Sequence, residues 1–108
     1  MRLWIDDVRP APEGYRWAKS VNEAKHSIKH NEFLYAHNPL YNDDCEIELI
    51  DIDHDAGDYA CDGGDYIKLL DWLEETGRNY PIRIHSMNPV GVANMRAIIE
   101  RNGWTEVR

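Results

Sequence analysis

Residues 47–52, IELIDI, followed at once by AspHisAsp at residues 53–55, form the stretch that decides the fold of this chain. Leu49, Ile50 and Ile52 make both faces of the segment apolar, which is typical of a central strand in a parallel sheet. The segment then runs directly into polar residues. We therefore expect a buried central strand with ionisable side chains at its carboxyl end.

Further strands are expected on both sides of this segment. RLWI at residues 2–5 is a short strand, and YRWA at residues 15–18, after the turn-forming PAPEG, is a weaker one. IRIH at residues 82–85 is a third clear strand, and residues 104–107 can supply a last one. Together with the central strand, these segments predict a five-stranded sheet.

Helices are expected over residues 20–31, 66–75 and 89–102, where apolar residues recur at helical spacing. Strands that alternate with helices in this way indicate a mainly parallel sheet with right-handed crossovers. The length of 108 residues leaves room for one domain. The sequence thus predicts a single three-layer α/β domain over residues 1–108.

The first predicted helix carries a recognisable start and a pair of histidines. Ser20 and Glu23 have the spacing of a capping box. His26 and His30 share one helix face, but no third ligand follows nearby, so we expect a solvated surface there rather than a metal site. Residues 32–44 lack periodicity and predict a loop.

Composition limits the classes of partner. Twelve basic and twenty acidic residues give a net charge of −8, which opposes a dedicated nucleic-acid surface or binding to an anionic membrane. The apolar runs are short and the features of a signal peptide are missing, so a cytoplasmic protein is expected. Cys45 and Cys61 lack the spacing of a zinc site, and we expect free thiols.

Three predicted strands end in polar side chains that could form a site: Asp6 and Asp7 after the first, Asp53, His54 and Asp55 after the central one, and His85, Ser86 and Asn88 after IRIH. Ligands of open α/β sheets bind beyond the carboxyl ends of the strands, so these groups should converge. Two like unit charges about 4 Å apart repel by about 4 kcal/mol at an effective dielectric near 20. Gathered carboxylates therefore favour a divalent cation, with Mg²⁺ the first candidate and Mn²⁺ or Zn²⁺ also compatible.

A phosphate partner is indicated by a second feature, and plainer interpretations remain open beside it. Ser86 and the start of the helix after Pro89 offer a hydroxyl and free amides of the kind that hold phosphate. Each aspartate could instead serve as a turn residue or a helix cap, and each histidine could simply brace a strand end. Asp51, which alternates in phase with Asp53, is expected to cap a neighbouring backbone group.

The blocks LWIDDVRP, IDIDHD and IRIHSMNP, in this order and spacing, resemble the cyclic-phosphate processing receiver domains, a branch of the receiver-like superfamily. The resemblance covers nearly the whole chain and implies a flavodoxin-like sheet of order 2-1-3-4-5. It also implies that the first and last helices of ordinary receivers are reduced or missing here. The phosphate-contacting lysine of those receivers is missing as well.

The resemblance assigns roles to the polar residues. It implies a metal site at Asp6, Asp7, Asp53 and Asp55, a catalytic set of His54, His85 and Asp53, and phosphate contacts from Ser86, Asn88 and Arg9. The hypothesis that follows is a metal-dependent phosphoesterase acting on a small cyclic phosphate, either an RNA 2′,3′-cyclic end or a cyclic nucleotide. Asp53 could alternatively attack as a nucleophile. The competing hypothesis is a non-catalytic or phospho-accepting receiver-like regulatory module.

Overall fold

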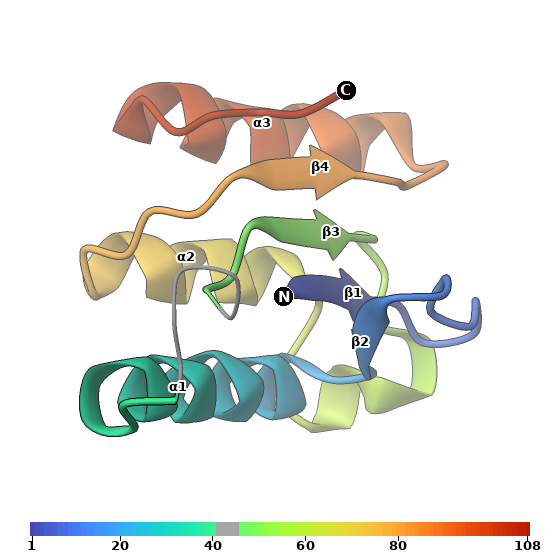
Figure 1. The fold of residues 1–108 in the computed structure, drawn as a ribbon. Helices are drawn as coiled ribbons and strands as arrows, with labels where there is room; N and C mark the ends of the chain where they lie inside the picture. The colour runs from blue at the N-terminus through green and yellow to red at the C-terminus, as the bar shows by residue number, and fades with distance from the viewer. Residues whose placement is uncertain (41–45) are drawn as a thin grey trace.

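The computed structural model describes residues 1–40 and 46–108 and shows a four-stranded parallel sheet with three helices (Figure 1). The strands lie in the order β2-β1-β3-β4, with all three pairs parallel. The element bounds are β1 Arg2–Ile5, β2 Tyr15–Ala18, α1 Val21–His37, β3 Leu49–Ile52, a short 3₁₀ helix Gly57–Cys61, α2 Ile67–Glu75, β4 Ile82–Ile84 and α3 Pro89–Asn102. The α/β class and the order of the first four strands are confirmed.

The predicted fifth strand is wrong in detail. Residues 104–107 make an isolated parallel bridge in which Glu106 lies opposite Ile82. The amide of Ile82 donates to the carbonyl of Thr105 at 3.0 Å, and the amide of Val107 donates to the carbonyl of Ile82 at 2.8 Å. Two hydrogen bonds to one residue form a bridge but not the ladder of a strand.

The two faces of the sheet differ in what covers them. Leu3, Ile5, Ile50 and Ile52 are fully buried, and they pack in one core with apolar side chains of α1, α2 and α3. In the described part of the chain no helix covers the opposite face, because residues 6–14 connect β1 to β2 without one. The expected loss of the first helix is confirmed, and the described residues form two layers rather than three.

The helix-free face carries aromatic and charged side chains. Trp4, on β1, alternates with the buried Leu3 and Ile5. It lies in register with Trp17 on β2 and Asp51 on β3. The indole of Trp4 donates to the carbonyl of Arg9 at 2.8 Å, and that of Trp17 donates to the carbonyl of Asp6 at 2.8 Å. These two tryptophans therefore hold the β1–β2 connection in place.

Helix α1 is longer than predicted. Ser20 is its N-cap and accepts the amide of Glu23 at 3.0 Å, whereas the Glu23 carboxylate accepts the amide of Lys19 rather than that of Ser20. The helix continues to His37, so the loop prediction is wrong for residues 32–37, and residues 41–45 of that loop lie outside the described residues. His26 and His30 are exposed on this helix, as expected.

An ion pair explains the extra helical turns. Glu32, in the added part of α1, accepts one hydrogen bond from Arg78 Nε, shared between its two oxygens, one from Arg78 Nη2, and a further one from the Tyr80 hydroxyl. The Arg78 guanidinium also lies 4.3 Å from the ring centroid of Trp72 on α2. A charged pair with several hydrogen bonds is among the stronger polar contacts in proteins. It ties α1 to the connection between α2 and β4.

We expect Glu32→Gln to destabilise the fold by about 2 kcal/mol at pH 7, the usual range for a hydrogen bond to a charged group. Burial alone would raise the pKa of Glu32, but hydrogen bonds from Arg78 and Tyr80 lower it below its ordinary value. The stabilisation is therefore present above the unfolded-state pKa of about 4.3 and is lost as the pH falls through the folded-state pKa. Urea unfolding at pH 7 and near pH 3 measures both effects.

The matched control is Glu13→Gln, an exposed glutamate in the β1–β2 connection. It should change the free energy of unfolding by less than about 0.5 kcal/mol. Equal stabilities of the Glu32 and Glu13 variants at pH 7 would show that the ion pair does not hold the end of α1.

Helix α3 has the predicted bounds. The side chain of Asn88 caps it by accepting the amide of Gly91 at 3.0 Å, and Pro89 is in the first turn. Gly103 ends the helix with φ of 66°, a left-handed conformation that glycine adopts without strain. No helix within residues 1–40 and 46–108 has the length and apolar character to cross a membrane.

Candidate functional site

Three strand ends meet at one edge of the sheet. Asp6 follows β1, Asp53 follows β3 and His85 follows β4, and one ligand atom from each lies within 4.8 Å of the other two. They converge because β3 lies in parallel register with both of its neighbours, pairing Ile52 with Ile5 and with Ile84. The residues that come next in each strand are therefore neighbours in space. These three residues are called the Asp6–Asp53–His85 cluster below.

Asp6 is fully buried and held as a carboxylate. Its Oδ1 accepts the amides of Val8 at 3.0 Å and Arg9 at 2.9 Å, and its Oδ2 lies 2.9 Å from His85 Nε2. Burial raises the pKa of Asp6, but these hydrogen bonds and His85 outweigh burial, so the pKa lies below its ordinary value. Oδ2 is the oxygen that points into the cluster.

His85 is placed between two carboxylates. Its Nδ1 lies 2.6 Å from Asp51 Oδ1, its Nε2 lies 2.9 Å from Asp6 Oδ2, and its ring stacks on Trp4 at 3.9 Å with an interplanar angle of 3°. A neutral imidazole has one N–H and can donate to only one of these oxygens. Which of the two oxygens receives that N–H depends on the tautomer of His85.

Asp51 is a residue whose role the sequence interpretation missed. Its side chain does not cap a backbone group but contacts His85, and it is fully buried. Its Oδ2 has no hydrogen-bond partner among the described residues and lies 3.6 Å from Arg83 Nη1. The signal was present in the sequence, since a charged residue within an apolar central strand needs a partner on the sheet.

Asp7 lies beside the cluster without belonging to its three donors. Burial raises the pKa of Asp7, and repulsion from Asp6 and Asp53 raises it further. Its Oδ2 lies so close to Gly57 that a Cβ there would overlap it. A carboxyl crowded by two others is the arrangement that a cation relieves. The role of Asp7 as a metal ligand stays a prediction.

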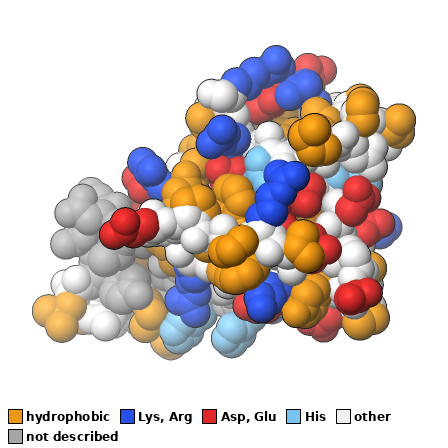
Figure 2. Space-filling model, turned by 90° about the vertical axis from the view of Figure 1, so that its right-hand side faces the viewer, with side chains coloured by type: hydrophobic (Ala, Val, Ile, Leu, Met, Phe, Trp, Pro, Cys, Tyr) orange, Lys and Arg blue, Asp and Glu red, His pale blue; other side chains and the backbone are white. Residues whose placement is uncertain are grey.

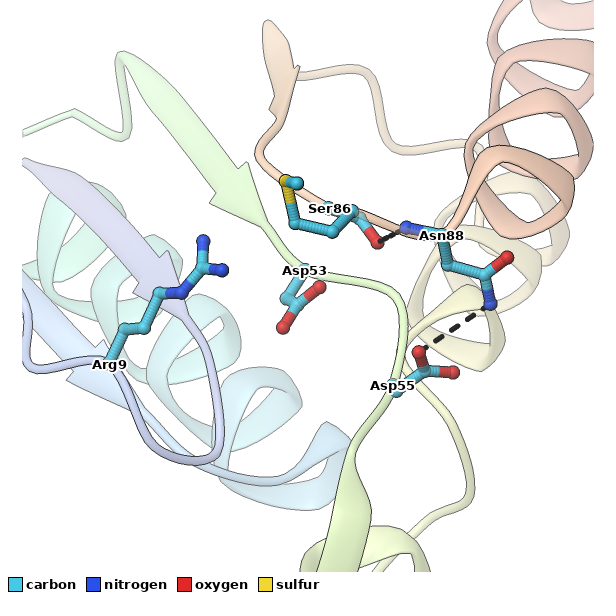
Figure 3. Close-up of a pocket in the computed structure, with 6 residues that line it drawn as sticks. Arg9, Asp53, Asp55, Ser86 and Asn88 are labelled. Carbon is cyan, nitrogen blue, oxygen red and sulfur yellow. Dashed lines mark hydrogen bonds between the residues drawn. The ribbon is translucent and has the colours of Figure 1, made fainter.

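A pocket of about 310 Å³ opens next to the cluster. Its lining comes from three loops at the carboxyl edge of the sheet: Arg9, Asp53, Asp55, Ser86, Met87 and Asn88 (Figure 3). Five of these six are predicted site residues. The guanidinium of Arg9 points toward Asp53 across the pocket and makes no ion pair within residues 1–40 and 46–108.

Three of the lining side chains are oriented by their own hydrogen bonds. Ser86 Oγ accepts the amide of Asn88 at 3.1 Å, which leaves its hydroxyl proton for a ligand. Asn88 uses Oδ1 to cap α3, so its Nδ2, which lies 3.5 Å from Asp55 Oδ2, is the group left to donate. Asp53 Oδ1 accepts the amide of His54 at 2.7 Å, which leaves Oδ2 for a ligand. Donors and free carboxylate oxygens thus line the same pocket.

A family model of the cyclic-phosphate processing receiver domain matches residues 1–101 of the chain. The chain belongs to this family. No curated protein and no solved structure matches it. In this receiver domain Asp6 and Asp53 lie in one cluster with His85, and Asp7 lies close enough to Asp6 and Asp53 for their charges to raise its pKa.

His54 is a predicted site residue that belongs neither to the pocket lining of this receiver domain nor to the Asp6–Asp53–His85 cluster. Its ring packs against Gly91 in the first turn of α3, and its side chain is 14% exposed. Its Nδ1 lies 2.8 Å from Asp55 Oδ1. These contacts fit the bracing role that the sequence left open, and the catalytic role of His54 stays a prediction.

We expect Gly91→Ala to destabilise this receiver domain by about 1–3 kcal/mol, because the new Cβ would overlap the His54 ring. The same substitution made together with His54→Ala should lose this penalty and gain up to about 1 kcal/mol from the higher helix propensity of alanine. Urea unfolding of the four proteins forms a double-mutant cycle. Additive effects of the two substitutions would show that the His54 ring does not pack on Gly91.

Proposed function

We propose that this receiver domain is a metal-dependent phosphoesterase that hydrolyses a small cyclic phosphate. The observation that carries the proposal is the Asp6–Asp53–His85 cluster, whose donor atoms lie within 4.8 Å of one another beside a pocket lined by Arg9, which makes no ion pair among the described residues. Carboxylates and an imidazole suit a divalent cation, and the arginine suits a phosphate. A cyclic phosphate ester combines the phosphate group with a bond that hydrolysis can open.

The donor set fits a hard cation. Asp6 Oδ2 and Asp53 Oδ2 are the carboxylate oxygens left for it, and the raised pKa of Asp7 reflects the crowding of negative charge that it would relieve. Mg²⁺ takes one or two protein carboxylates and keeps positions for phosphate oxygens, so it is the first candidate. A cation bound there neutralises charge on the phosphate and makes a bound water more acidic.

The residues of the pocket then divide the remaining tasks. Arg9, Ser86 Oγ and Asn88 Nδ2 donate to the phosphate oxygens and hold the ring phosphorus for attack by water. The P–O bond of the ring breaks as the new P–O bond forms. His85 Nε2 takes the proton that the attacking water loses and passes it to the leaving alkoxide oxygen, while Asp51 holds the other proton on Nδ1.

The direct test is turnover of a 2′,3′-cyclic nucleotide with Mg²⁺ or Mn²⁺, followed by product chromatography. We expect hydrolysis that chelation abolishes and that His85→Ala reduces by at least about 100-fold, the usual contribution of a general acid or base. His26→Ala, which removes an exposed histidine on α1, is the control and should keep full activity. Unchanged turnover in the His85 variant would contradict the mechanism.

The same experiment separates two roles of His85. If His85 transfers a proton, His85→Ala should keep Mn²⁺ affinity and lose turnover; if it is a ligand, both should fall together.

A phospho-accepting module is the competing function, favoured by the free Oδ2 of Asp53 in the pocket. Stable labelling at Asp53 by acetyl phosphate, with no turnover of any cyclic phosphate, would favour that module. The cytoplasmic location remains a sequence prediction.

A further inference from the structure

Apolar side chains stand exposed on two of the three loops that border the pocket. Val8 is 74% exposed next to Arg9, and Met87 is 84% exposed between Ser86 and Asn88. Figure 2, which faces the carboxyl edge of the sheet, shows hydrophobic side chains around the charged and histidine side chains there. Large apolar side chains on the rim of a polar pocket mark a place where a ligand or partner makes contact.

The exposure is not that of a loose loop. The amides of Val8 and Arg9 both donate to the buried Asp6, and the amide that follows Met87 donates to Ser86 Oγ. The backbone that carries Val8 and Met87 is thus held by the same groups that form the site. A ligand that reaches the Asp6–Asp53–His85 cluster would find the backbone that carries these side chains held in place.

The size of the pocket calls for more than a phosphate group. Its volume is about 310 Å³. Pockets for organic ligands begin at about 300 Å³. Met87 lines this volume itself, so the organic part of a bound ester would contact its thioether. Sulfur and an arginine plane are both good partners for a flat aromatic ring.

Charge then limits the length of the ligand. The lining has one cation, Arg9, against the two carboxylates of Asp53 and Asp55. The chain as a whole carries −8. One phosphate can be accommodated by a cation at the cluster, but the further phosphates of an RNA strand would meet negative charge without a basic partner. The lining therefore favours a nucleotide monomer over a strand end.

We propose that Met87 forms a nucleobase subsite, so that the substrate is a cyclic mononucleotide whose base packs on Met87 while its phosphate lies at Arg9 and the cluster. This inference rests on the proposed function. The inference goes beyond the proposed function because it selects one of the two substrate classes that the sequence left open. It also names the side chains that would select this class.

The test compares three substrates: 2′,3′-cyclic AMP, glycerol 1,2-cyclic phosphate, which lacks a base, and a short RNA with a 2′,3′-cyclic end. We expect kcat/KM to be at least tenfold higher for cyclic AMP than for the glycerol ester. Met87→Ser should raise KM for cyclic AMP by about 5-fold to 10-fold with little change in kcat, and should leave the glycerol ester unaffected. Leu40→Ser, at a leucine that is 85% exposed after α1, is the control.

The outcomes separate this inference from the proposed function. Metal-dependent turnover with equal kcat/KM for cyclic AMP and the glycerol ester overturns the subsite but supports the phosphoesterase. A tenfold preference for the RNA overturns the inference that the substrate is a mononucleotide. If nothing is hydrolysed, the proposed function fails, and calorimetric binding of 3′-AMP and inorganic phosphate still decides the subsite. If 3′-AMP binds more tightly than inorganic phosphate and Met87→Ser removes that difference, the subsite is supported. Equal affinities of the two ligands overturn the subsite.

Discussion

Asp51→Asn is expected to lower kcat for a cyclic phosphate by at least about 100-fold while the domain stays folded. The Asp51 carboxylate accepts a hydrogen bond from His85 Nδ1 at 2.6 Å. This contact turns Nε2 toward Asp6 and the pocket edge. Asparagine keeps the shape of the side chain but removes the charge and can present an N–H to Nδ1. Loss of the partner that orients a histidine costs about 10-fold to 100-fold at metal sites and about 10⁴-fold in a serine protease triad.

The structural readout of this variant is independent of turnover. Nitrogen NMR of His85 should show protonation of Nδ1 in the wild-type domain and a loss of that proton in Asp51→Asn. Asp58→Asn, at an exposed aspartate in the 3₁₀ helix, is the control and should change neither the spectrum nor kcat. A variant with the wild-type tautomer and wild-type kcat would show that the buried Asp51–His85 contact has no part in the chemistry.

Asp6→Asn is expected to weaken Mn²⁺ binding by at least about 100-fold, because it removes a charge at the centre of the cluster. Titration calorimetry with Mn²⁺ measures the affinity of both proteins.

Asp58→Asn again supplies the control and should bind Mn²⁺ as the wild type does. If Asp6→Asn keeps the wild-type Mn²⁺ affinity, the cation site lies outside this cluster, nearer to Asp7 and Asp55.

The candidate site could be predicted in outline because the information is local. Each strand is a short run of apolar residues that stops at a polar one, and parallel strands bring their carboxyl ends to one edge. Asp6, Asp53 and His85 were identified in this way, and they do converge. The start of α1 at Ser20 and the whole of α3 followed from capping and spacing for the same reason.

The errors all concern contacts between distant parts of the chain. Residues 32–37 lack helical periodicity, and they are helical in the fold that pairs Glu32 with Arg78, 46 positions away. The bond between Asp51 and His85 spans 34 positions, so an alternating pattern alone could not reveal it. Which way the His54 ring turns depends on the space left by Gly91.

The amino-acid order alone thus specified the parallel α/β class, the strands and the edge at which the polar residues gather, because apolar periodicity and turn residues act over a few positions. Packing in three dimensions specified which nitrogen of His85 faces Asp51, which side chains line the pocket, and that the second face of the sheet is covered by tryptophans rather than helices. Side-chain orientation and burial arise from neighbours brought together by the fold, and no local pattern encodes them.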